Sequence, residues 1–333
     1  MVTRRGGVAL VALVTLLAAL VPGAFAAEGE PPAAVAEKLP ADPGLGAPAP
    51  RDGSYGATAN VASYQQNALV THGAYQYTAW YAADRRAVLA RRTLAAAGAD
   101  GPWEPIFLDA VLYSDDSHNN ITLGVSASDG RLHVALATHT RRIRYLRSLP
   151  GVAAGVGEWS SRSFERLRAD LPGAPRAPQW WTYPAFENVA GGLLLTWRDG
   201  SAMGGGQVLA RYDDNASGTW TYLGRFSGPE GEWAGAYGTS GSRYGYLHGF
   251  AENPRTGDLE ITWTWRENAT VQDPRCVQAP ANRDLMYARS PDGGMTWLSQ
   301  SGEVIARTGT EDVITRADDP LTLAVAIDVT SGM

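Results

Sequence analysis

Cysteine is nearly absent from this sequence: Cys276 is the only one in 333 residues. A single thiol cannot form an internal disulfide, so stability must come from a buried hydrophobic core, and a chain of this length can form one. We interpret Cys276, which lies between Arg275 and Val277, as incidental rather than as a catalytic nucleophile. Histidine is also scarce, with five residues in the chain, so two that come close together are informative.

Missing motifs exclude several classes of function. The chain has no Cys/His pairs with zinc spacing, no Gly-rich phosphate loop with a lysine and no Gly-x-Ser-x-Gly elbow. Lys38 is the only lysine, and we infer no function from this bias. The formal net charge of −6 and the isoelectric point near 5.4 argue against nucleic acid or an anionic membrane surface as a partner.

Long apolar runs are missing except near the start of the chain, where Val8–Val21 follows Arg4 and Arg5. This run, with the small residues of Ala24–Ala26 behind it, predicts a signal peptide over residues 1–26 rather than a membrane span. We therefore expect a secreted, extracellular protein that does not contact a membrane once the signal is removed. We also expect a monomer.

Helical periodicity is scarce as well. Residues 27–55 are rich in Pro and Ala and are predicted to be a disordered linker. From residue 56 onward, short alternating stretches are separated by Gly, Asp, Asn and Pro, a pattern typical of an all-β sandwich, barrel or propeller. Residues 162–169 could form one or two turns of helix. Strands are predicted at Tyr75–Ala83, Ala87–Arg92, Ile121–Ser126, Leu132–Ala137, Ile143–Arg147, Ala185–Asn188, Leu193–Arg198, Val208–Tyr212, Trp220–Arg225, Tyr246–Ala251, Leu259–Arg266, Leu285–Ser290 and Val304–Arg307.

The spacing of the turns favours a propeller among these all-β folds. Turns at Asp129–Gly130, Ala190–Gly192 and Thr256–Asp258 lie about 60 residues apart, and each precedes a strand of similar pattern that starts at a leucine. Ser290–Trp297 has Ser, Asp, Gly and Trp at positions 1, 3, 5 and 8, which is the Asp-box pattern of turns in sialidase-like propellers. These features predict a β-propeller of four-stranded blades, and they predict the fold rather than the function.

Two of the five histidines lie at one end of a predicted hairpin. The strands Ile121–Ser126 and Leu132–Ala137 flank the turn Asp129–Gly130. His118 comes just before the first strand and His139 just after the second, so both imidazoles are expected at the same end.

The residues alone leave the role of these histidines open. His118 could be a surface histidine with Asp115 or Asp116 as its cap, or a functional group in a loop where sites gather. Asp115 and Asp116 could also bind calcium together with a backbone oxygen, although adjacent carboxylates are usually a solvated turn. The sequence therefore requires no cofactor and leaves a metal undecided. His133 lies within the second strand and is interpreted as a packed or solvent-facing residue.

The chain resembles the BNR-repeat (Asp-box) β-propeller family that includes ulvan lyases and lyases of L-rhamnose–D-glucuronate linkages. The resemblance runs over about residues 60–307 and implies blades of four strands, usually about seven of them. This chain has room for roughly five or six, so the propeller domain expected over residues 56–333 is short at its C-terminus, either truncated or closed differently. The matching segments are Asp116–Asn119, Thr138–His139, Thr182–Pro184, Trp197–Gly200, Arg211–Asp213, Tyr246–Gly249, Thr264–Glu267 and Asn282–Tyr287.

The resemblance implies a secreted carbon–oxygen lyase that cleaves a uronic-acid-containing polysaccharide by β-elimination, with an ulvan-like or rhamnose–glucuronate linkage as substrate. Such a reaction needs a cation for the carboxylate, a base for the neighbouring proton and an acid for the departing oxygen. The implied catalytic residues are Arg198 as the carboxylate clamp, His118 or Tyr183 as the base, and Tyr183 or Tyr246 as the acid. The implied substrate-binding residues are Asn119, His139, His248 and Arg266.

From the sequence alone, these residues could also have purely structural roles. Tyr183 would usually be a core residue, with an extended backbone before Pro184. Arg198 could form a salt bridge with Asp199 in a turn. Alternation places Tyr246 and His248 on one face of their strand.

Two other functions remain as alternatives. Asp-box turns also occur in sialidases, so a sialidase-like glycoside hydrolase is one, although the carboxylates that it needs are not evident. A non-catalytic carbohydrate-binding propeller is the other. The expected partner of the lyase is an anionic polysaccharide substrate.

Overall fold

The computed structural model describes residues 67, 69–113, 116, 118–136, 138–200, 205–213, 218–235, 238–271, 282–315 and 323–325. All of them belong to one unit, Leu39–Met333. The predicted signal peptide, the predicted linker and Cys276 lie outside the described residues. Within them, no helix is long and apolar enough to cross a membrane.

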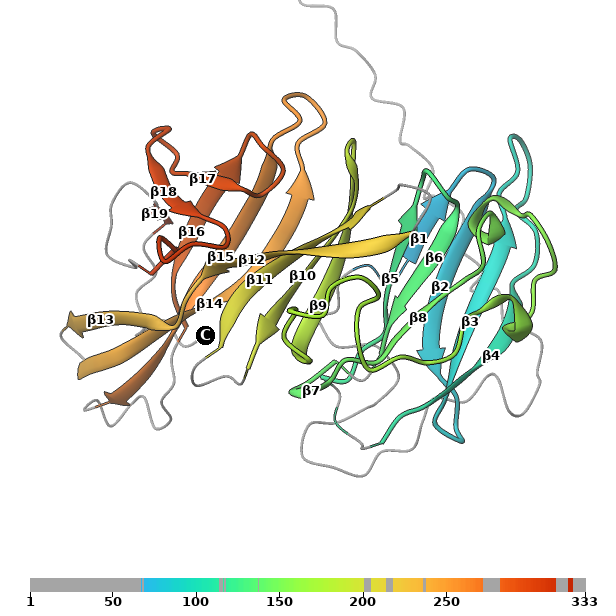
Figure 1. Ribbon diagram of the computed structural model, residues 1–333, viewed down its shortest axis with the longest axis horizontal. Coiled ribbons are helices and arrows are strands. Elements are labelled where there is room, and N and C mark those ends of the chain that lie inside the picture. Colours follow the sequence, from blue (N-terminus) through green and yellow to red (C-terminus); the bar gives the residue numbers. More distant parts are fainter. Residues whose placement is uncertain are drawn as a thin grey trace, which may run out of the picture. The chain divides into compact units, whose positions relative to one another are not determined.

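In this described part, the strands form four antiparallel sheets that follow one another along the chain (Figure 1). The first has the order β1-β2-β3-β4, and the second has the order β5-β6-β8. Two short 3₁₀ helices follow β8. These elements are β1 (Leu69–His72), β2 (Tyr75–Tyr81), β3 (Arg86–Thr93), β4 (Glu104–Val111), β5 (Thr122–Ser126), β6 (Arg131–Ala135), β8 (Tyr145–Arg147), η1 (Val152–Ala154) and η2 (Ser161–Ser163).

The third sheet has the order β12-β11-β10-β9-β7, and the fourth has the order β13-β14-β15-β16-β17-β18 with β19 paired to β16. Their strands are β7 (Arg141–Arg142), β9 (Trp180–Val189), β10 (Gly192–Asp199), β11 (Gly206–Asp213), β12 (Thr219–Ser227), β13 (Glu230–Gly235), β14 (Gly238–Glu252), β15 (Leu259–Val271), β16 (Asn282–Ser290), β17 (Thr296–Leu298), β18 (Val304–Arg307) and β19 (Leu323–Val325). The all-β class predicted from the sequence is confirmed.

One local prediction is wrong. Residues 162–169 do not form a helix of one or two turns, because only Ser161–Ser163 is helical and Phe164 is already extended. Ser148 and Phe164 form an isolated antiparallel bridge, and Tyr145 bridges Arg168 in the same way. The segment after η2 therefore runs alongside β8, and these backbone pairs replace the helical bonds.

Three clusters of buried residues each join one sheet to the next. The first joins the sheet of β1–β4 to the β5–β6 hairpin, the second joins β6 and β8 to the third sheet, and the third joins the third sheet to the fourth. Many of the tryptophans serve this purpose rather than sugar binding. Those that are buried are Trp181, Trp197, Trp220, Trp263, Trp265 and Trp297.

The β5–β6 hairpin is buried on both faces. The register pairs Thr122 with Ala135 and Ser126 with Arg131, and Gly130 has a φ of 64° in the connecting turn. Every residue of β5 is buried, because Leu123 belongs to the first cluster while Gly124 packs against Phe186 of β9. The hairpin is therefore held between two neighbouring sheets.

Gly124→Ala tests this packing. A Cβ atom at position 124 would lie 2.7 Å from both Cβ and Cγ of Phe186, so the strands would have to move apart. We expect the free energy of unfolding in urea to fall by about 1–3 kcal/mol. Gly191→Ala is the matched control, because a Cβ there meets nothing within 4 Å. Equal stability of the two variants would contradict the tight contact.

Two acidic side chains join β9 to β14. The N–H of Glu252 donates to Glu187 Oε1 at 3.2 Å, and the N–H of Ala190 donates to Glu252 Oε2 at 2.7 Å. Burial raises the pKa of Glu187 to about 7, opposed by the hydrogen bond from the Glu252 backbone and supported by the charge of Glu252. The ionised form of Glu187 is therefore disfavoured in the folded protein.

Glu187→Gln should flatten the pH dependence of stability. A carboxyl group stabilises the folded state at low pH if its pKa is higher in the folded protein than in the unfolded chain. This stabilisation is fully present below the unfolded pKa, and it is lost as the pH rises through the folded value near 7. Urea unfolding at about pH 5 and about pH 8 should therefore show a smaller loss of stability in the variant than in the wild type. Glu303→Gln, at an exposed position, is the control and should keep the full loss. The same loss in Glu187→Gln would refute this role.

Candidate active site

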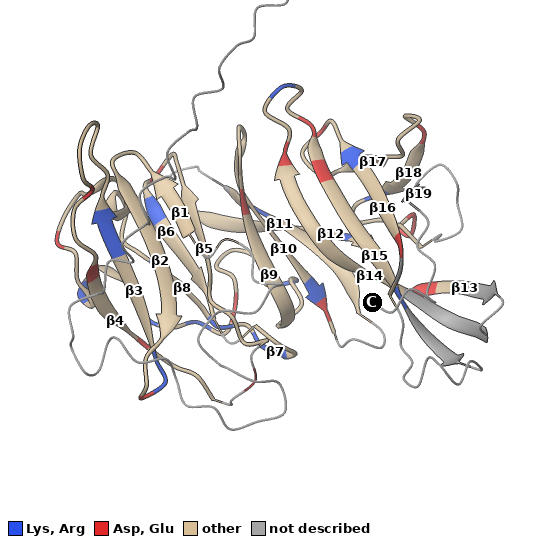
Figure 2. Ribbon diagram, turned by 180° about the vertical axis from the view of Figure 1, so that it is seen from behind, with Lys and Arg blue, Asp and Glu red and all other residues tan. Residues whose placement is uncertain are grey.

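Six of the predicted site residues form one cluster, which we call the site cluster: His118, His139, Tyr183, Arg198, Tyr246 and Arg266. They come from different elements, because His118 precedes β5, His139 follows β6, and the others lie in β9, β10, β14 and β15. Lys, Arg, Asp and Glu are sparse along much of the strand length and are more frequent in loops and at strand ends (Figure 2).

Ring contacts run through the site cluster. The His118 and His139 rings are stacked, with centroids 4.3 Å apart and an interplanar angle of 24°. The Tyr183 ring is nearly parallel to that of His139, at 5.7 Å and 9°, and lies 6.0 Å from that of His118. Tyr246 meets Tyr183 edge-on at 6.4 Å. Two imidazoles and two phenols thus adjoin one another.

Arg198 is a buried cation between these two phenols. Its side chain is 1% exposed, and its Cζ lies 5.2 Å from the centroid of Tyr183 and 4.8 Å from that of Tyr246. Within the described residues, its Nε and Nη2 have no hydrogen-bond partner. The alternative salt bridge with Asp199 is not formed, because Asp199 pairs with Arg225 at 3.4 Å. An unpaired buried charge is costly, so an anion is the expected ligand of this guanidinium.

The backbone around Tyr183 is irregular. The predicted extended conformation before Pro184 is wrong at Tyr183, whose φ is 53°, a value that non-glycine residues rarely adopt. The pairing of β9 with β10 shifts between Thr196 and Arg198, and the N–H of Tyr183 donates to the carbonyl of Thr138 at 2.7 Å. The bulge and this bond hold the ring of Tyr183 over His139. Strain of this kind often accompanies a functional site.

Arg266 is a second cation against the ring of Tyr246. Its Cζ is 5.1 Å from the centroid of Tyr246, so this one ring contacts two guanidinium groups. Its Nε is buried without a hydrogen-bond partner among the described residues, and Arg266 pairs in register with Asn282 of β16. The site cluster therefore presents two cations.

The other two predicted site residues make hydrogen bonds beside these ring contacts. His248 is the exposed residue at a bulge of β14, and its Nε2 lies 2.9 Å from Thr264 Oγ1. Asn119 is buried, and its Oδ1 accepts the N–H of His139 at 3.3 Å, so it supports the loop that carries this histidine. His133 is also buried, with Nδ1 2.6 Å from Tyr145 Oη, which agrees with a packed strand residue.

Asp116 is a functional candidate that the sequence analysis considered only as a cap or a calcium ligand. Its Oδ1 lies 2.5 Å from His118 Nδ1, and its Oδ2 lies 2.6 Å from His139 Nδ1. Burial would raise its pKa, but hydrogen bonds from His139 and His118 outweigh burial, so the pKa of Asp116 is lowered. The spacing Asp-x-His was the available signal, whereas the contact with a histidine 23 residues away was not readable.

Electrostatics favours a neutral His139. Burial lowers its pKa, the hydrogen bond and charge of Asp116 oppose this, and the nearby His118 and Arg198 lower it further. The net effect is a pKa below the usual range of histidine. A neutral imidazole at neutral pH has one nitrogen with a lone pair, which is what a base requires.

The three residues Asp116, His118 and His139 could also hold a metal ion, since one ligand atom of each lies within 4.8 Å of the others. Two imidazoles and one carboxylate suit a transition metal better than calcium, which prefers oxygen ligands. The oxygen–nitrogen distances of 2.5 and 2.6 Å nevertheless describe groups in direct hydrogen-bond contact, shorter even than the usual charge-assisted N–H···O bond of about 2.7–2.9 Å. Ligands of a tetrahedral zinc ion would be farther apart, at about 3.4 Å.

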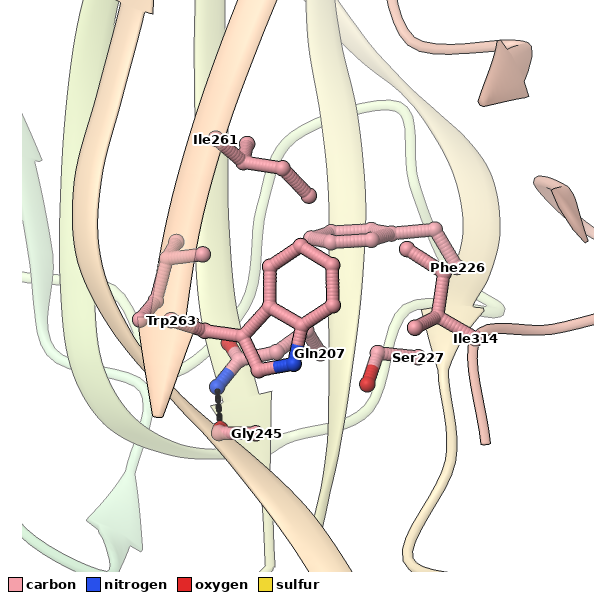
Figure 3. A pocket seen from close by; sticks show the side chains of 8 residues that line it. Gln207, Phe226, Ser227, Gly245, Ile261, Trp263 and Ile314 are labelled. Carbon is pink, nitrogen blue, oxygen red and sulfur yellow. Dashed lines mark hydrogen bonds between the residues drawn. The ribbon is translucent and has the colours of Figure 1, made fainter. Parts of the chain in front are cut away.

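A small cavity between the third and fourth sheets does not provide an alternative site (Figure 3). It has a volume of about 10 Å³, and Phe226, Ile261 and Trp263 lie around it while Gln207 Nε2 donates to the carbonyl of Gly245 at 2.9 Å. This is room for about one water molecule and far too little for a sugar.

Solved structures show the fold of this chain, and a family model shows its family. The fold is that of β-propeller lyases: the polysaccharide lyase Uly1 has a TM-score of 0.63 at 20% identity, covering 84% of this chain and 62% of that one. An ulvan lyase solved with -[GlcA(1-4)Rha3S]- bound has a TM-score of 0.57 at 13% identity, covering 85% and 60%. The BNR repeat-containing family model matches residues 75–333, and the chain belongs to that family.

These likenesses establish the β-propeller fold that the sequence predicts. The chain spans about three fifths of the length of both lyases, with coverage of 62% and 60%. No curated protein sequence matches it.

Proposed function

We propose that this protein is a secreted polysaccharide lyase that cleaves a uronic-acid-containing polymer by β-elimination. The observation that carries the proposal is the buried guanidinium of Arg198 between Tyr183 and Tyr246, whose Nε and Nη2 have no hydrogen-bond partner in the part of the chain that the structure describes. A planar guanidinium can bind a carboxylate through two parallel hydrogen bonds, which a uronate would provide.

Arg198 would make the substrate acidic. Binding its carboxylate neutralises the charge and stabilises the negative charge that develops when the proton on the adjacent carbon, C5, is removed. The electron pair of that C–H bond forms the C4=C5 double bond, and the C4–O4 bond breaks. The departing oxygen takes a proton from an acid, so the products are an unsaturated uronate and a free hydroxyl.

The imidazoles and phenols of the site cluster would move these protons. His118, His139 and Tyr183 are the candidate bases, and Tyr183 or Tyr246 is the candidate acid. Arg198 lies against both phenol rings, so both tyrosines lie beside the guanidinium that we propose binds the uronate.

The substrate would be an anionic polysaccharide, ulvan-like or with a rhamnose–glucuronate linkage, and the reaction needs no cofactor. Two arginines with buried N–H groups that lack a partner among the described residues suit a polymer that carries several negative groups. The fold relative solved with a glucuronate–sulfated rhamnose ligand supports testing such a polymer first. Arg266 is the second cation, and we assign it to substrate binding. We expect the enzyme to act as an extracellular monomer.

The test is incubation of the secreted protein with ulvan, a rhamnose–glucuronate gum and pectin while the ultraviolet absorbance of the unsaturated uronate is followed. A rise with either of the first two supports the lyase. New reducing ends without that absorbance would instead support a sialidase-like hydrolase. Binding without turnover would support a carbohydrate-binding propeller. A folded protein that neither cleaves nor binds any of the polymers refutes the proposal.

A further inference from the structure

The Asp116 carboxylate bridges the two stacked imidazoles. One oxygen lies 2.5 Å from His118 Nδ1 and the other 2.6 Å from His139 Nδ1. The stacked arrangement of the rings, 4.3 Å apart, follows from this shared partner, because each Nδ1 is drawn towards one oxygen of the same group.

This arrangement determines the tautomer of both histidines. An ionised carboxylate only accepts hydrogen bonds, so each Nδ1 must carry a hydrogen. In a neutral imidazole the acceptor lone pair is then on Nε2. Since both Nδ1 atoms face one carboxylate, both Nε2 atoms face away from it.

The surrounding loop keeps Asp116 in place. The N–H of His118 donates to Asp116 Oδ1 at 3.0 Å, and the N–H of Asn119 donates to the Asp116 carbonyl at 2.9 Å. Asn119 in turn accepts the N–H of His139, and Thr138 Oγ1 donates to the His118 carbonyl at 3.2 Å. These bonds connect the segment before β5 to the segment after β6, so the carboxylate is held in place beside both rings.

We propose that Asp116 is a positioning residue that holds His118 and His139 together in the Nδ1–H tautomer, so that both present a basic Nε2 beside Tyr183. The inference rests on the proposed lyase function. Asp116 itself touches neither the substrate nor the reacting atoms. It orients both rings and stabilises the imidazolium that forms when either one accepts a proton.

The test is Asp116→Asn, with Asp109→Asn at an exposed position of β4 as the control. An amide can donate to Nδ1 and so favours the wrong tautomer. We expect kcat on the cleaved polymer to fall by about 10²–10⁴-fold, KM to stay within about threefold and thermal unfolding to remain cooperative. Asp109→Asn should keep wild-type kinetics.

Nitrogen NMR of the imidazoles provides a readout that does not depend on activity. In the wild type, both His118 and His139 should show the Nδ1–H form. Asp116→Asn should shift the ring that faces the amide NH₂ towards Nε2–H, because the carbonyl oxygen can still accept from the other Nδ1. Unchanged tautomers, or a kcat within about threefold of the wild type, would overturn the positioning role. Loss of activity on chelation, with recovery on adding zinc, would overturn it in favour of a metal site.

These outcomes separate the two proposals. A wild type that cleaves no polymer refutes the lyase, while the tautomers still decide whether Asp116 orients the histidines. An active wild type with an equally active Asp116→Asn variant refutes only the positioning role.

Discussion

Arg198→Met is expected to reduce kcat/KM on the cleaved polymer by at least about 10³-fold without destabilising the protein. The buried guanidinium has two groups, Nε and Nη2, without a partner in the described residues, so its charge lowers stability in the absence of substrate. Methionine fills a similar volume between the two phenol rings and has no charge. We therefore expect the free energy of unfolding to stay equal or to rise by up to about 2 kcal/mol.

The control for this prediction is Arg225→Met. Arg225 forms the ion pair with Asp199 that Arg198 does not form, and its side chain is 39% exposed. An exposed pair contributes at most about 1 kcal/mol, and no step of the reaction uses it, so activity should stay near that of the wild type. The role of Arg198 would be refuted if its variant lost stability instead of activity, because that pattern belongs to a structural arginine.

Tyr183→Phe is expected to lower kcat by about 10²–10⁴-fold with little change in KM. Phenylalanine keeps the ring that is parallel to His139 and in contact with Arg198, and it removes only the hydroxyl. A loss confined to kcat would therefore identify the hydroxyl as a proton donor or acceptor.

Tyr222→Phe provides the comparison for the phenol. Tyr222 is half-buried against Trp197, with ring centroids 6.3 Å apart, and burial raises its pKa, so its hydroxyl remains protonated. Its variant should retain wild-type kinetics. If Tyr183→Phe kept more than about a third of the wild-type kcat, the proton would have to be carried by the imidazoles or by Tyr246.

Much of the fold could be predicted from the sequence, because most strands alternate or form buried runs between turn residues. The Asp129–Gly130 turn correctly brought His118 and His139 to one end of a hairpin. The strand Glu104–Val111 was missed, since Pro105 and its charged residues obscure the pattern. The structure explains this composition: β4 is the edge of its sheet, where proline and charges are tolerated.

Less of the candidate site could be predicted, because it depends on contacts between sheets. Tyr183, Arg198 and Tyr246 lie in three different strands, and only the family resemblance suggested that they act together. The bulge that gives Tyr183 its positive φ has no signal in the local sequence. Asp199 forms its ion pair with Arg225 of β12 and not with its sequence neighbour Arg198. This choice likewise depends on which side chains the third sheet brings close together.

Because the β5–β6 hairpin is buried on both faces, we expect the bound polymer, and not this part of the protein, to change conformation on binding. Its strands are enclosed between two sheets, so they cannot shift without disturbing the packing of both. The polysaccharide that we propose as substrate would then have to adopt the glycosidic torsion angles that the end of this hairpin accepts, and the loss of conformational entropy would fall on the sugar chain. Such a surface favours stiff, regularly repeating polymers, whose torsion angles in solution already lie close to those of the bound state.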